Sequence, residues 1–362
     1  SVKELRRLGL LPDIIVLRCC KDISNSIKQK ISMFCSVPID HIITNPDAET
    51  IYDVPNIFYK QNILSIISGK LNLKFNDASQ PNSIKIICSN SPVINIGIVG
   101  KYTGLSDSYL SIIRALEHAS IVNNCSAHIQ WISSENIQDN NKQLNNCDGI
   151  IIPGGFGVRG TEGKIYTAKY CRNNNIPMLG ICLGLHIMCI EAARNELGAD
   201  CNSYEFDKNT LHPIIIPIVK NNNKMKLGLY KTQISPDSLT HKIYNSIIIH
   251  ERHRHRYEIN PTYISTIKNN GLTISGIGCE PDIIDIVEDN TKTFYIGCQY
   301  HPEFLSTLKW SAPLFSYFVK CSLSTSISSS FSSLNDCGIL THTLIDPMDA
   351  RMNAFPMSYG TV

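Results

Sequence analysis

The sequence predicts an α/β protein whose main domain is an open, mostly parallel sheet with helices on both faces, preceded by a partial α/β segment. Two observations lead to this prediction. Short apolar runs alternate along the chain with segments whose apolar residues recur at helical spacing. Several of these runs end in glycine, as buried strands do where they lead into a tight turn. Strands that alternate with helices build parallel sheets with both faces covered.

Length and composition limit what the chain can be. Its 362 residues suffice for two modest domains, and no apolar run approaches the roughly 20 residues of a membrane helix. The 33 basic and 31 acidic side chains nearly balance, so we expect neither a nucleic-acid groove nor a membrane-binding patch. Fourteen cysteines without any CxxC pair favour free thiols in a reducing cytoplasm. Because SVKELRRLGL lacks an initiator Met and a targeting segment, we expect a piece of a longer protein.

The first part of the chain predicts a small α/β segment over residues 1–73. The apolar run 13–17 (DIIVL) is typical of a buried strand, and the polar stretch 24–34 is compatible with a helix. Prolines then divide the segment into short pieces. Residues 74–92 are polar and irregular, so we expect a linker there.

The main domain is predicted over residues 93–320. Its expected strands are 94–100 (INIGIVG), 148–155 (DGIIIPGG), the start of 176–184 (IPMLGICLG) and the start of 294–304 (FYIGCQYHPEF). After the first strand, Ser106 and Asp107 can cap a helix. The serine-rich tail over residues 321–362 has no clear periodicity, and we expect it to be mobile and outside the core.

The strongest motif is the pentapeptide GICLG at residues 180–184, with Cys182 at its centre. A nucleophile between glycines, placed between a strand and a helix, forms a tight turn that exposes its side chain. The helix N-terminus favours the thiolate there. The alternative is that Cys182 is one buried cysteine among fourteen, but the flanking glycines favour the nucleophile.

A thiolate nucleophile requires a histidine that is itself held in place. His301 and Glu303 follow the last predicted strand, and Glu303 can orient the imidazole. Taken alone, HPE would more often be a loop with a proline kink; together with the elbow it predicts a catalytic pair.

The third motif is the glycine run PGGFG at residues 153–157. Its free backbone amides can form an oxyanion hole from Gly155 N–H and Leu183 N–H. A phosphate-binding loop or an ordinary turn is the alternative, but no Lys-Ser/Thr follows the glycines, so a Walker-type loop is excluded.

In this order and spacing the three motifs resemble the class I (triad) glutamine amidotransferases. The stretches PGGFGVRGTEGK, GICLG, ERHRHRYEIN and QYHPEF narrow the resemblance to the glutaminase domain of the CTP synthase family. SVKELRRLGLLPDIIVLRC and IYDVPNIFY are similar to the end of that family's synthetase (amidoligase) domain. The resemblance covers roughly residues 1–320.

The resemblance implies a glutamine-hydrolysing ligase of pyrimidine nucleotide biosynthesis. Cys182 would attack the side-chain amide of L-glutamine, with His301 as proton shuttle and Glu303 as its orienter, through a thioester. The ammonia would aminate UTP to CTP with ATP and Mg in a homotetrameric enzyme, whereas glutamine hydrolysis needs no cofactor. GTP is the implied activator: Arg159 is a candidate for sensing it, and Leu110 stands where some relatives have lysine.

The family's glutamine-binding positions correspond to a set that supplies a carboxylate for the substrate ammonium and an arginine for its carboxylate. They are Gly155, Leu183, Gly184, Leu185, His186, Glu205 and Arg256. Arg252 and Arg254 lie close to Arg256 in sequence, and His186 stands where the family usually has glutamine. The histidine could alter glutamine binding or its pH dependence, or simply pack in the first turn. The stretch ERHRHR could also be a solvated basic strand, and we expect no metal site.

The family's nucleotide contacts correspond to Lys30, Pro46, Asp47 and Ala48, which cannot form a site by themselves. Two alternatives stay open. One is another triad glutamine amidotransferase, such as one for GMP synthesis; the GFGVRG and RHRHRYE signatures argue against it. The other is a non-catalytic assembly or regulatory domain, which should have lost Cys182, His301 or Glu303. A cysteine peptidase with the same elbow has the least support.

Overall fold

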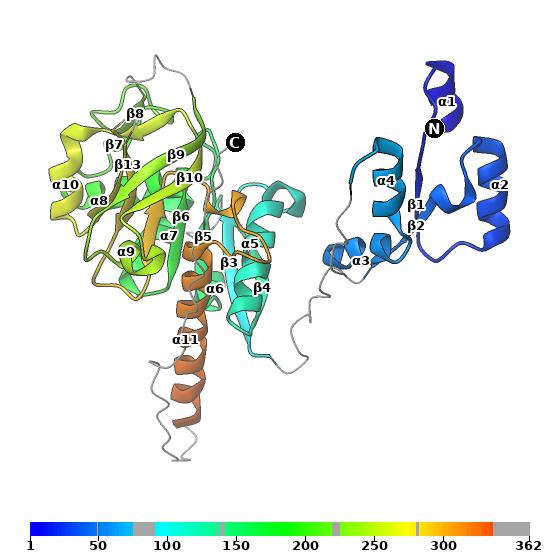
Figure 1. Ribbon diagram of the computed structural model, residues 1–362. Coiled ribbons are helices and arrows are strands. Elements are labelled where there is room, and N and C mark those ends of the chain that lie inside the picture. The colour runs from blue at the N-terminus through cyan, green and yellow to red at the C-terminus, as the bar shows by residue number, and fades with distance from the viewer. Residues whose placement is uncertain are drawn as a thin grey trace. The chain divides into compact units, whose positions relative to one another are not determined.

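The computed structural model describes residues 1–48, 50–74, 91–135, 137, 142–218, 225–279 and 282–335. The chain divides into two compact units, residues 1–88 and 89–362 (Figure 1). Most of the predicted linker 74–92 and the end of the predicted tail, residues 336–362, lie outside the described residues. Over the described ranges, no helix is long and apolar enough to cross a membrane.

The first unit is a small α/β segment, as predicted. Strands β1 (Ile15–Cys19) and β2 (Ile42–Pro46) pair in parallel. Its helices are α1 (Val2–Arg7), α2 (Asn25–Cys35), α3 (Val54–Tyr59) and α4 (Ile63–Leu71), with 3-10 turns at Ile39–His41 and Ile51–Asp53. The strand that carries buried side chains is β2, whose Ile42 and Ile43 are both 1% exposed. The segment therefore has a core of its own around β2.

The second unit is built on a nine-stranded sheet, in the order β10-β9-β12-β13-β14-β6-β5-β3-β4. The five strands from β14 to β4 are parallel, and they include the four strands predicted from the sequence. Their bounds are β3 (Val93–Gly100), β4 (Ser126–Ser133), β5 (Gly149–Ile152), β6 (Met178–Ile181) and β14 (Tyr295–Cys298). Beyond β14 the sheet continues with antiparallel strands, which are β9 (Lys226–Ile234), β10 (Ile248–His255), β12 (Thr273–Gly278) and β13 (Ile284–Glu288). The α/β class is confirmed, and the antiparallel extension is an addition that the sequence did not predict.

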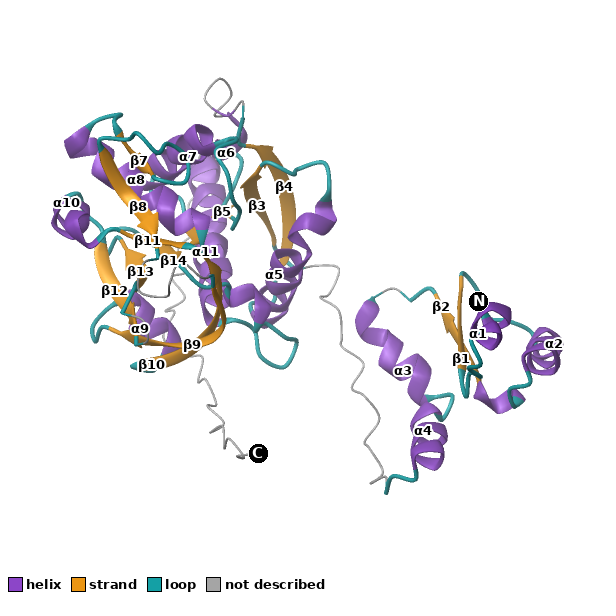
Figure 2. Ribbon diagram, turned by 90° about the horizontal axis from the view of Figure 1, so that it is seen from above, coloured by secondary structure: helices purple, strands orange, loops and turns teal. Residues whose placement is uncertain are grey.

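Helices cover both faces of this sheet (Figure 2). On one face α7 (Thr161–Asn173) packs on α8 (Leu183–Leu197), and on the other α5 (Leu110–Val122) packs on α11 (Pro313–Asn335). Each face has its own apolar cluster, so the sheet is buried on both sides. Shorter helices complete the layers: α6 (Lys142–Asn145), α9 (Leu239–Tyr244), α10 (Ile264–Asn269) and the 3-10 turns Ser106–Tyr109, Pro261–Tyr263 and Pro302–Phe304.

A second, three-stranded sheet has the order β11-β8-β7. It consists of β7 (Cys201–Ser203), β8 (His212–Pro217) and β11 (Tyr257–Ile259). Arg256 lies between β10 and β11, and Glu205 lies just after β7. The small sheet therefore brings a carboxylate and an arginine, distant in sequence, to one region of the fold.

The predicted domain end at residue 320 falls inside α11, because this helix continues to Asn335. Cys321 and Ser322 are buried, and Ser322 packs against Gly149 of β5. Serines fit this helix because their hydroxyls donate back to carbonyls one turn earlier, as Ser322 Oγ does to Phe318 O at 3.0 Å. Serine-rich composition therefore did not mark the end of the domain.

Candidate active site

Cys182 lies at the turn between β6 and α8, as predicted, with φ 52° and ψ −96°. This is the left-handed half of the backbone map, which a residue with a side chain rarely occupies. The flanking glycines are sterically required. A Cβ on Gly180 would lie 2.7 Å from Met188 Sδ, and one on Gly184 would overlap the carbonyl oxygen of Ile152. The turn therefore presents the Cys182 side chain at the carboxyl ends of the parallel strands.

His301 and Glu303 follow β14, the strand next to β6, and so return to the same edge of the sheet. His301 Nδ1 and Glu303 Oε1 are 2.7 Å apart, and Cys182 lies close enough to the imidazole to affect its pKa. A hydrogen bond to another strand holds the loop that carries His301: the His301 N–H donates to the carbonyl of Arg252 on β10 at 2.8 Å. The three predicted catalytic side chains are thus joined in one chain of contacts.

The charge state of His301 follows from these neighbours. Burial favours the neutral ring, but the Glu303 carboxylate and Cys182 outweigh burial and raise the pKa of His301 to about 10. Since Nδ1–H faces the carboxylate, Nε2 is the nitrogen left for Cys182. The arrangement therefore favours a protonated His301 ring beside the sulfur of the candidate nucleophile.

The glycine run after β5 lies directly against this site. A Cβ on Gly154 would lie 2.8 Å from His301 Cε1 and 3.5 Å from Cys182 Cβ. A Cβ on Gly155 would lie 3.5 Å from Leu183 Cδ2. Leu183 is the first residue of α8, so its N–H has no acceptor within the helix. The two predicted oxyanion donors, Gly155 and Leu183, are therefore neighbours beside Cys182.

Glu205 and Arg256 also reach this region. Glu205 Oε1 accepts a hydrogen bond from Gly157 N–H at 2.8 Å, which attaches the carboxylate to the glycine run. Burial raises the pKa of Glu205, while Gly157 N–H and the charges of Lys101 and Arg256 partly oppose the shift. Glu205 is thus attached to the glycine run beside the nucleophile and interacts with Arg256, and an amino-acid ligand requires both charges.

Exposure does not separate the three arginines, because Arg256 is exposed like Arg252 and Arg254, and what marks Arg256 is its charge interaction with Glu205. The strand β10 itself has a regular pattern. Its side chains alternate between exposed and buried, with His250, Arg252 and Arg254 exposed and Glu251, His253 and His255 buried. Arg252 and Arg254 offer their backbone carbonyls to His301 and Cys182 and turn their guanidinium groups outward. A solvated basic strand therefore describes one face of β10 and not the other.

The stretch 183–186 does not form a continuous ligand surface. Leu185 is fully buried in the apolar cluster that contains α7 and α8, and Gly184 is packed against β5. His186 is buried and lies 2.8 Å, Nε2 to Oε1, from Gln299. Burial lowers the pKa of His186 to about 4, with the bond to Gln299 opposing the shift. His186 is thus a packed, neutral histidine with one polar partner.

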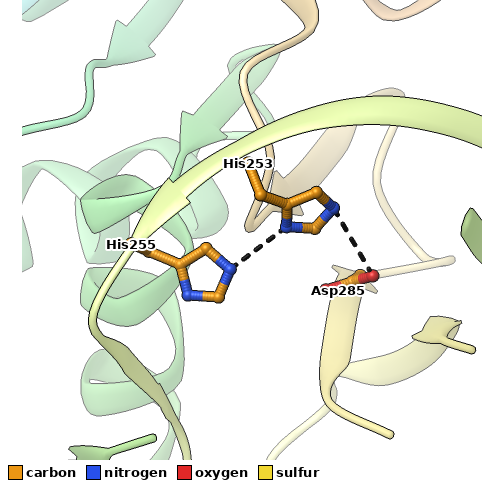
Figure 3. A group of neighbouring side chains, drawn as sticks. All are labelled: His253, His255 and Asp285. Atoms are coloured by element: carbon orange, nitrogen blue, oxygen red, sulfur yellow. Dashed lines mark hydrogen bonds and ion pairs between the residues drawn. The ribbon is translucent and has the colours of Figure 1, made fainter. Parts of the chain in front are cut away.

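Behind the site lies a group of buried polar side chains that the sequence analysis did not predict. Figure 3 shows His255 Nε2 3.1 Å from His253 Nδ1, whose ring points on toward Asp285. Asp285 is in turn 3.5 Å from the ammonium of Lys226, and both side chains are fully buried. The period-two alternation RHRHR in a strand was the available signal, since it places the histidines on one face.

Among the described residues, His253, His255 and Asp285 form the group whose donor atoms lie within 4.8 Å of one another, as metal ligands do. Their hydrogen bonds argue for another role. His255 Nδ1 contacts the carbonyl of Tyr257 at 2.9 Å and must donate to it, so its Nε2 accepts from His253 Nδ1–H. The Lys226 ammonium already lies beside the carboxylate. The two histidines are therefore hydrogen-bonded to each other, whereas His253 Nε2 lies 3.8 Å from Asp285, whose carboxylate pairs with Lys226.

The predicted nucleotide contacts lie in the first unit, on separate elements. Lys30 is exposed on α2, whereas Pro46 ends β2 and is followed by Asp47 and Ala48. Asp47 Oδ1 is 3.8 Å from Arg18 Nε across the β1–β2 pair. The nucleotide contacts therefore stay a prediction.

Comparison with known proteins agrees with this geometry. Residues 105–321 match the family model described as glutamine amidotransferase class-I, and residues 1–73 match that of the CTP synthase N-terminus. The chain is 41% identical to the CTP synthase of Methanococcoides burtonii over 338 residues, covering 90% of this chain and 63% of the relative. It is 41% identical to the CTP synthase of Thermosynechococcus vestitus over 328 residues, covering 87% of this chain and 60% of the relative.

The chain therefore spans about 60% of the length of these curated relatives. A solved structure, the glutaminase domain of Trypanosoma brucei CTPS with bound acivicin, is similar at 36% identity and a TM-score of 0.61. The match covers 64% of this chain and 94% of that one. With the elbow, the His–Glu pair and the glycine run assembled around one cysteine, this chain belongs to the class I glutamine amidotransferase family.

Proposed function

We propose that the second unit hydrolyses L-glutamine to glutamate and ammonia through a thioester on Cys182. The observation that carries the proposal is the contact chain from Cys182 to His301 to Glu303 at a strained turn beside the glycine run. Amidotransferase family membership gives the substrate class, and the pairing of Glu205 with Arg256 suits an amino acid that carries both charges.

The geometry suggests the order of events. The Cys182 thiolate attacks the side-chain amide carbon, and the negative oxygen that forms is stabilised by Gly155 N–H and Leu183 N–H. His301 donates its proton to the departing nitrogen, which leaves as ammonia. Water, deprotonated by His301, then attacks the thioester and releases glutamate and the thiolate. Glu303 keeps the imidazole oriented throughout.

A direct test measures ammonia release from glutamine by the wild-type chain and by Cys182→Ala. We expect at least a thousandfold loss in the variant, because the covalent route is removed. Labelling of Cys182 by a glutamine-like diazo-ketone provides an independent reading. Equal rates in the two proteins, or absence of labelling where exposed thiols react, would contradict the proposal.

In the longer protein we propose that the ammonia aminates UTP to CTP at the expense of ATP, with Mg. The match of residues 1–73 to the CTP synthase N-terminus and the names of the relatives support this proposal. Lys30 and residues 46–48 do not form a triphosphate site by themselves, so the amination chemistry is proposed for the longer protein, with its synthetase domain as partner. A homotetramer is proposed on the same resemblance. A cytoplasmic location is proposed because the cysteines of the described residues are free thiols.

We further propose GTP as an activator, bound near the end of the glycine run. Lys101 and Arg159 both lie over the ring of Tyr102, at 5.5 and 5.3 Å, and Lys101 donates to the carbonyl of Phe156. Burial and the charge of Lys101 lower the pKa of Lys164 to about 8, as expected where cations gather. Cations around an exposed aromatic ring suit a purine triphosphate. Leu110, where some relatives have lysine, is the exposed first residue of α5.

The activator proposal is tested by measuring ammonia release with and without GTP in wild type and in Arg159→Ala. Lys268→Ala, an exposed lysine on α10, is the matched control. We expect GTP stimulation to fall several-fold in Arg159→Ala and to persist in Lys268→Ala. Full stimulation in Arg159→Ala would rule out this site.

A further inference from the structure

Gln299 is a buried polar side chain at the active site that the mechanism above does not use. It follows β14, is fully buried, and its backbone N–H donates to the carbonyl of Asp285 at 2.7 Å. Its side-chain Nε2 lies 3.8 Å from Cys182 Sγ, within hydrogen-bonding distance for sulfur. A buried amide in contact with the nucleophile must affect its charge state, because its two ends have opposite effects on a sulfur atom.

The orientation of this amide is fixed by His186. Gln299 Oε1 lies 2.8 Å from His186 Nε2, and a carbonyl oxygen can only accept, so Nε2 carries the proton. The neutral ring then has a bare Nδ1, and this atom is buried without a hydrogen-bond partner in the structure. With its oxygen held by His186, the Gln299 amide presents its N–H to Cys182.

The opposite arrangement would have the opposite effect. If Nδ1 of His186 carried the proton, the bare Nε2 would accept from the Gln299 amide, and the amide oxygen would face the sulfur. An oxygen there accepts from a thiol and repels a thiolate, whereas an N–H stabilises the thiolate. The tautomer of His186 therefore decides which form of Cys182 the amide supports.

The other groups around the sulfur leave a role for this donor. The Arg254 carbonyl lies 3.9 Å from Cys182 Sγ and accepts from the thiol form. His301 and Cys298 both lie close enough to Cys182 to interact with it electrostatically, and Glu303 acts through His301. His255 on β10 is a titratable group that interacts electrostatically with His186 on α8. The sulfur thus lies between a carbonyl that favours the thiol and an amide that favours the thiolate.

We propose that Gln299 is a catalytic residue that donates its side-chain N–H to the Cys182 thiolate, and that His186 is the positioning residue that holds the amide in that orientation. This inference rests on the proposed glutamine hydrolysis, in which the Cys182 thiolate is the nucleophile.

The test follows alkylation of Cys182 by iodoacetamide as a function of pH, with mass spectrometry reading the label at that residue. Gln299→Met keeps the chain length without a donor, and Gln299→Glu keeps the shape with a carboxylate. His186→Leu removes the holding donor, and His186→Gln restores one. The exposed Cys279 reports the reactivity of an unrelated thiol in every sample, and thermal unfolding confirms that each variant is folded.

We expect Gln299→Met to lower the alkylation rate of Cys182 at neutral pH about tenfold, and to move its rise to higher pH. Gln299→Glu should have a larger effect because it adds a negative charge. His186→Leu should shift the profile in the same direction, and His186→Gln should recover the wild-type profile. Cys279 should react equally throughout.

An unchanged Cys182 profile in folded Gln299→Met would overturn the role of Gln299. An unchanged profile in His186→Leu, or no recovery in His186→Gln, would overturn the role of His186. Because alkylation needs no glutamine, the test is separate from the proposed function. A wild-type chain that fails to hydrolyse glutamine but shows these shifts contradicts only the proposed function.

Discussion

At the scale of single residues, the active site depends on a backbone conformation that Cys182 adopts at a cost. A positive φ in a residue with a side chain costs about 1–3 kcal/mol, which the surrounding structure must offset. The close packing of Gly180 and Gly184 against Met188 and Ile152 fixes the turn. The strained turn in turn holds the Cys182 sulfur beside His301 and the glycine run.

Gly184→Ala tests this packing. The new methyl group would overlap the carbonyl oxygen of Ile152, which belongs to a buried strand and cannot move aside. We expect a loss of about 2–4 kcal/mol in the free energy of unfolding and of most glutaminase activity. The matched control is Gly104→Ala, where a Cβ meets nothing within 4 Å. Urea unfolding of both variants checks the prediction, and equal stabilities would contradict it.

The buried histidine at position 186 makes the native state sensitive to acid. The unfolded chain takes up the proton near pH 6.5, whereas burial lowers the native pKa to about 4. Between these values the unfolded state binds more protons, so stability falls as the pH falls, by about 3 kcal/mol at pH 4 for this residue.

His186→Gln should therefore lose less stability than wild type between pH 7 and pH 4.5. The buried carboxyls Asp285 and Glu251, whose pKa values burial raises to about 6 and 7, favour the native state on acidification in both proteins. Comparing urea unfolding of the two proteins at both pH values removes this common contribution. Parallel pH dependences would show that His186 does not titrate in this way.

At the scale of elements, the amino-acid composition of β10 and of α11 does not by itself indicate which of their side chains are buried. β10 has histidines and a glutamate buried on one face and arginines exposed on the other. α11 carries its serines along a helix that packs on α5. In both elements the spacing of the residues decides what is buried.

Truncation distinguishes the two boundaries proposed for α11. A chain ending at Lys320 loses the buried Cys321 and Ser322, and exposes the contact around Gly149. We expect this truncation to lower the melting temperature by several degrees, corresponding to about 2 kcal/mol of lost packing. A chain ending at Asn335 keeps the described helix and should melt like wild type. Equal melting of the two truncated chains would restore the boundary at residue 320.

The ion pair between β9 and β13 is tested by a double-mutant cycle. Lys226→Met leaves the Asp285 carboxyl buried without its cationic partner, and we expect a loss of about 3–5 kcal/mol at neutral pH. Lys226→Met combined with Asp285→Asn removes both charges and keeps a polar partner for Thr232, which donates to Asp285 at 2.6 Å. The double variant should be more stable than Lys226→Met alone, as measured by urea unfolding. Additive losses would contradict the coupling.

At the scale of the whole molecule, the chain consists of two units, each with its own contacts. The site residues that converge on Cys182 all lie in the second unit, while Lys30 and residues 46–48 lie in the first. Chemistry at Cys182 should therefore depend on the second unit alone, whereas any control by nucleotides requires more of the protein.

A chain of residues 91–335 should therefore fold and keep the reactivity of Cys182 toward a glutamine-like diazo-ketone. We expect a labelling rate within about threefold of the 362-residue chain, because no described site side chain is removed. The Cys182→Ala version of the short chain is the control. Loss of labelling in a folded short chain would mean that the first unit contributes to the site.

Several features could be predicted from the sequence because they are local. The glycines around Cys182 specify a turn that few other residues could form, and the apolar runs at 94–100 and 148–155 specify buried strands of a parallel sheet. The motifs GICLG and HPE each identify their own residues, so the sequence alone predicts Cys182, His301 and Glu303.

Contacts between distant segments required the tertiary structure. Gln299 meets His186 because β14 lies beside β6 in the sheet, and no spacing in the sequence indicates that pairing. The charge interaction between Arg256 and Glu205 likewise joins segments that are far apart in the sequence. The inclusion of residues 321–335 in the domain depended on what α11 packs against. Local backbone preferences act over a few residues, whereas burial is decided by elements that the chain brings together from far apart.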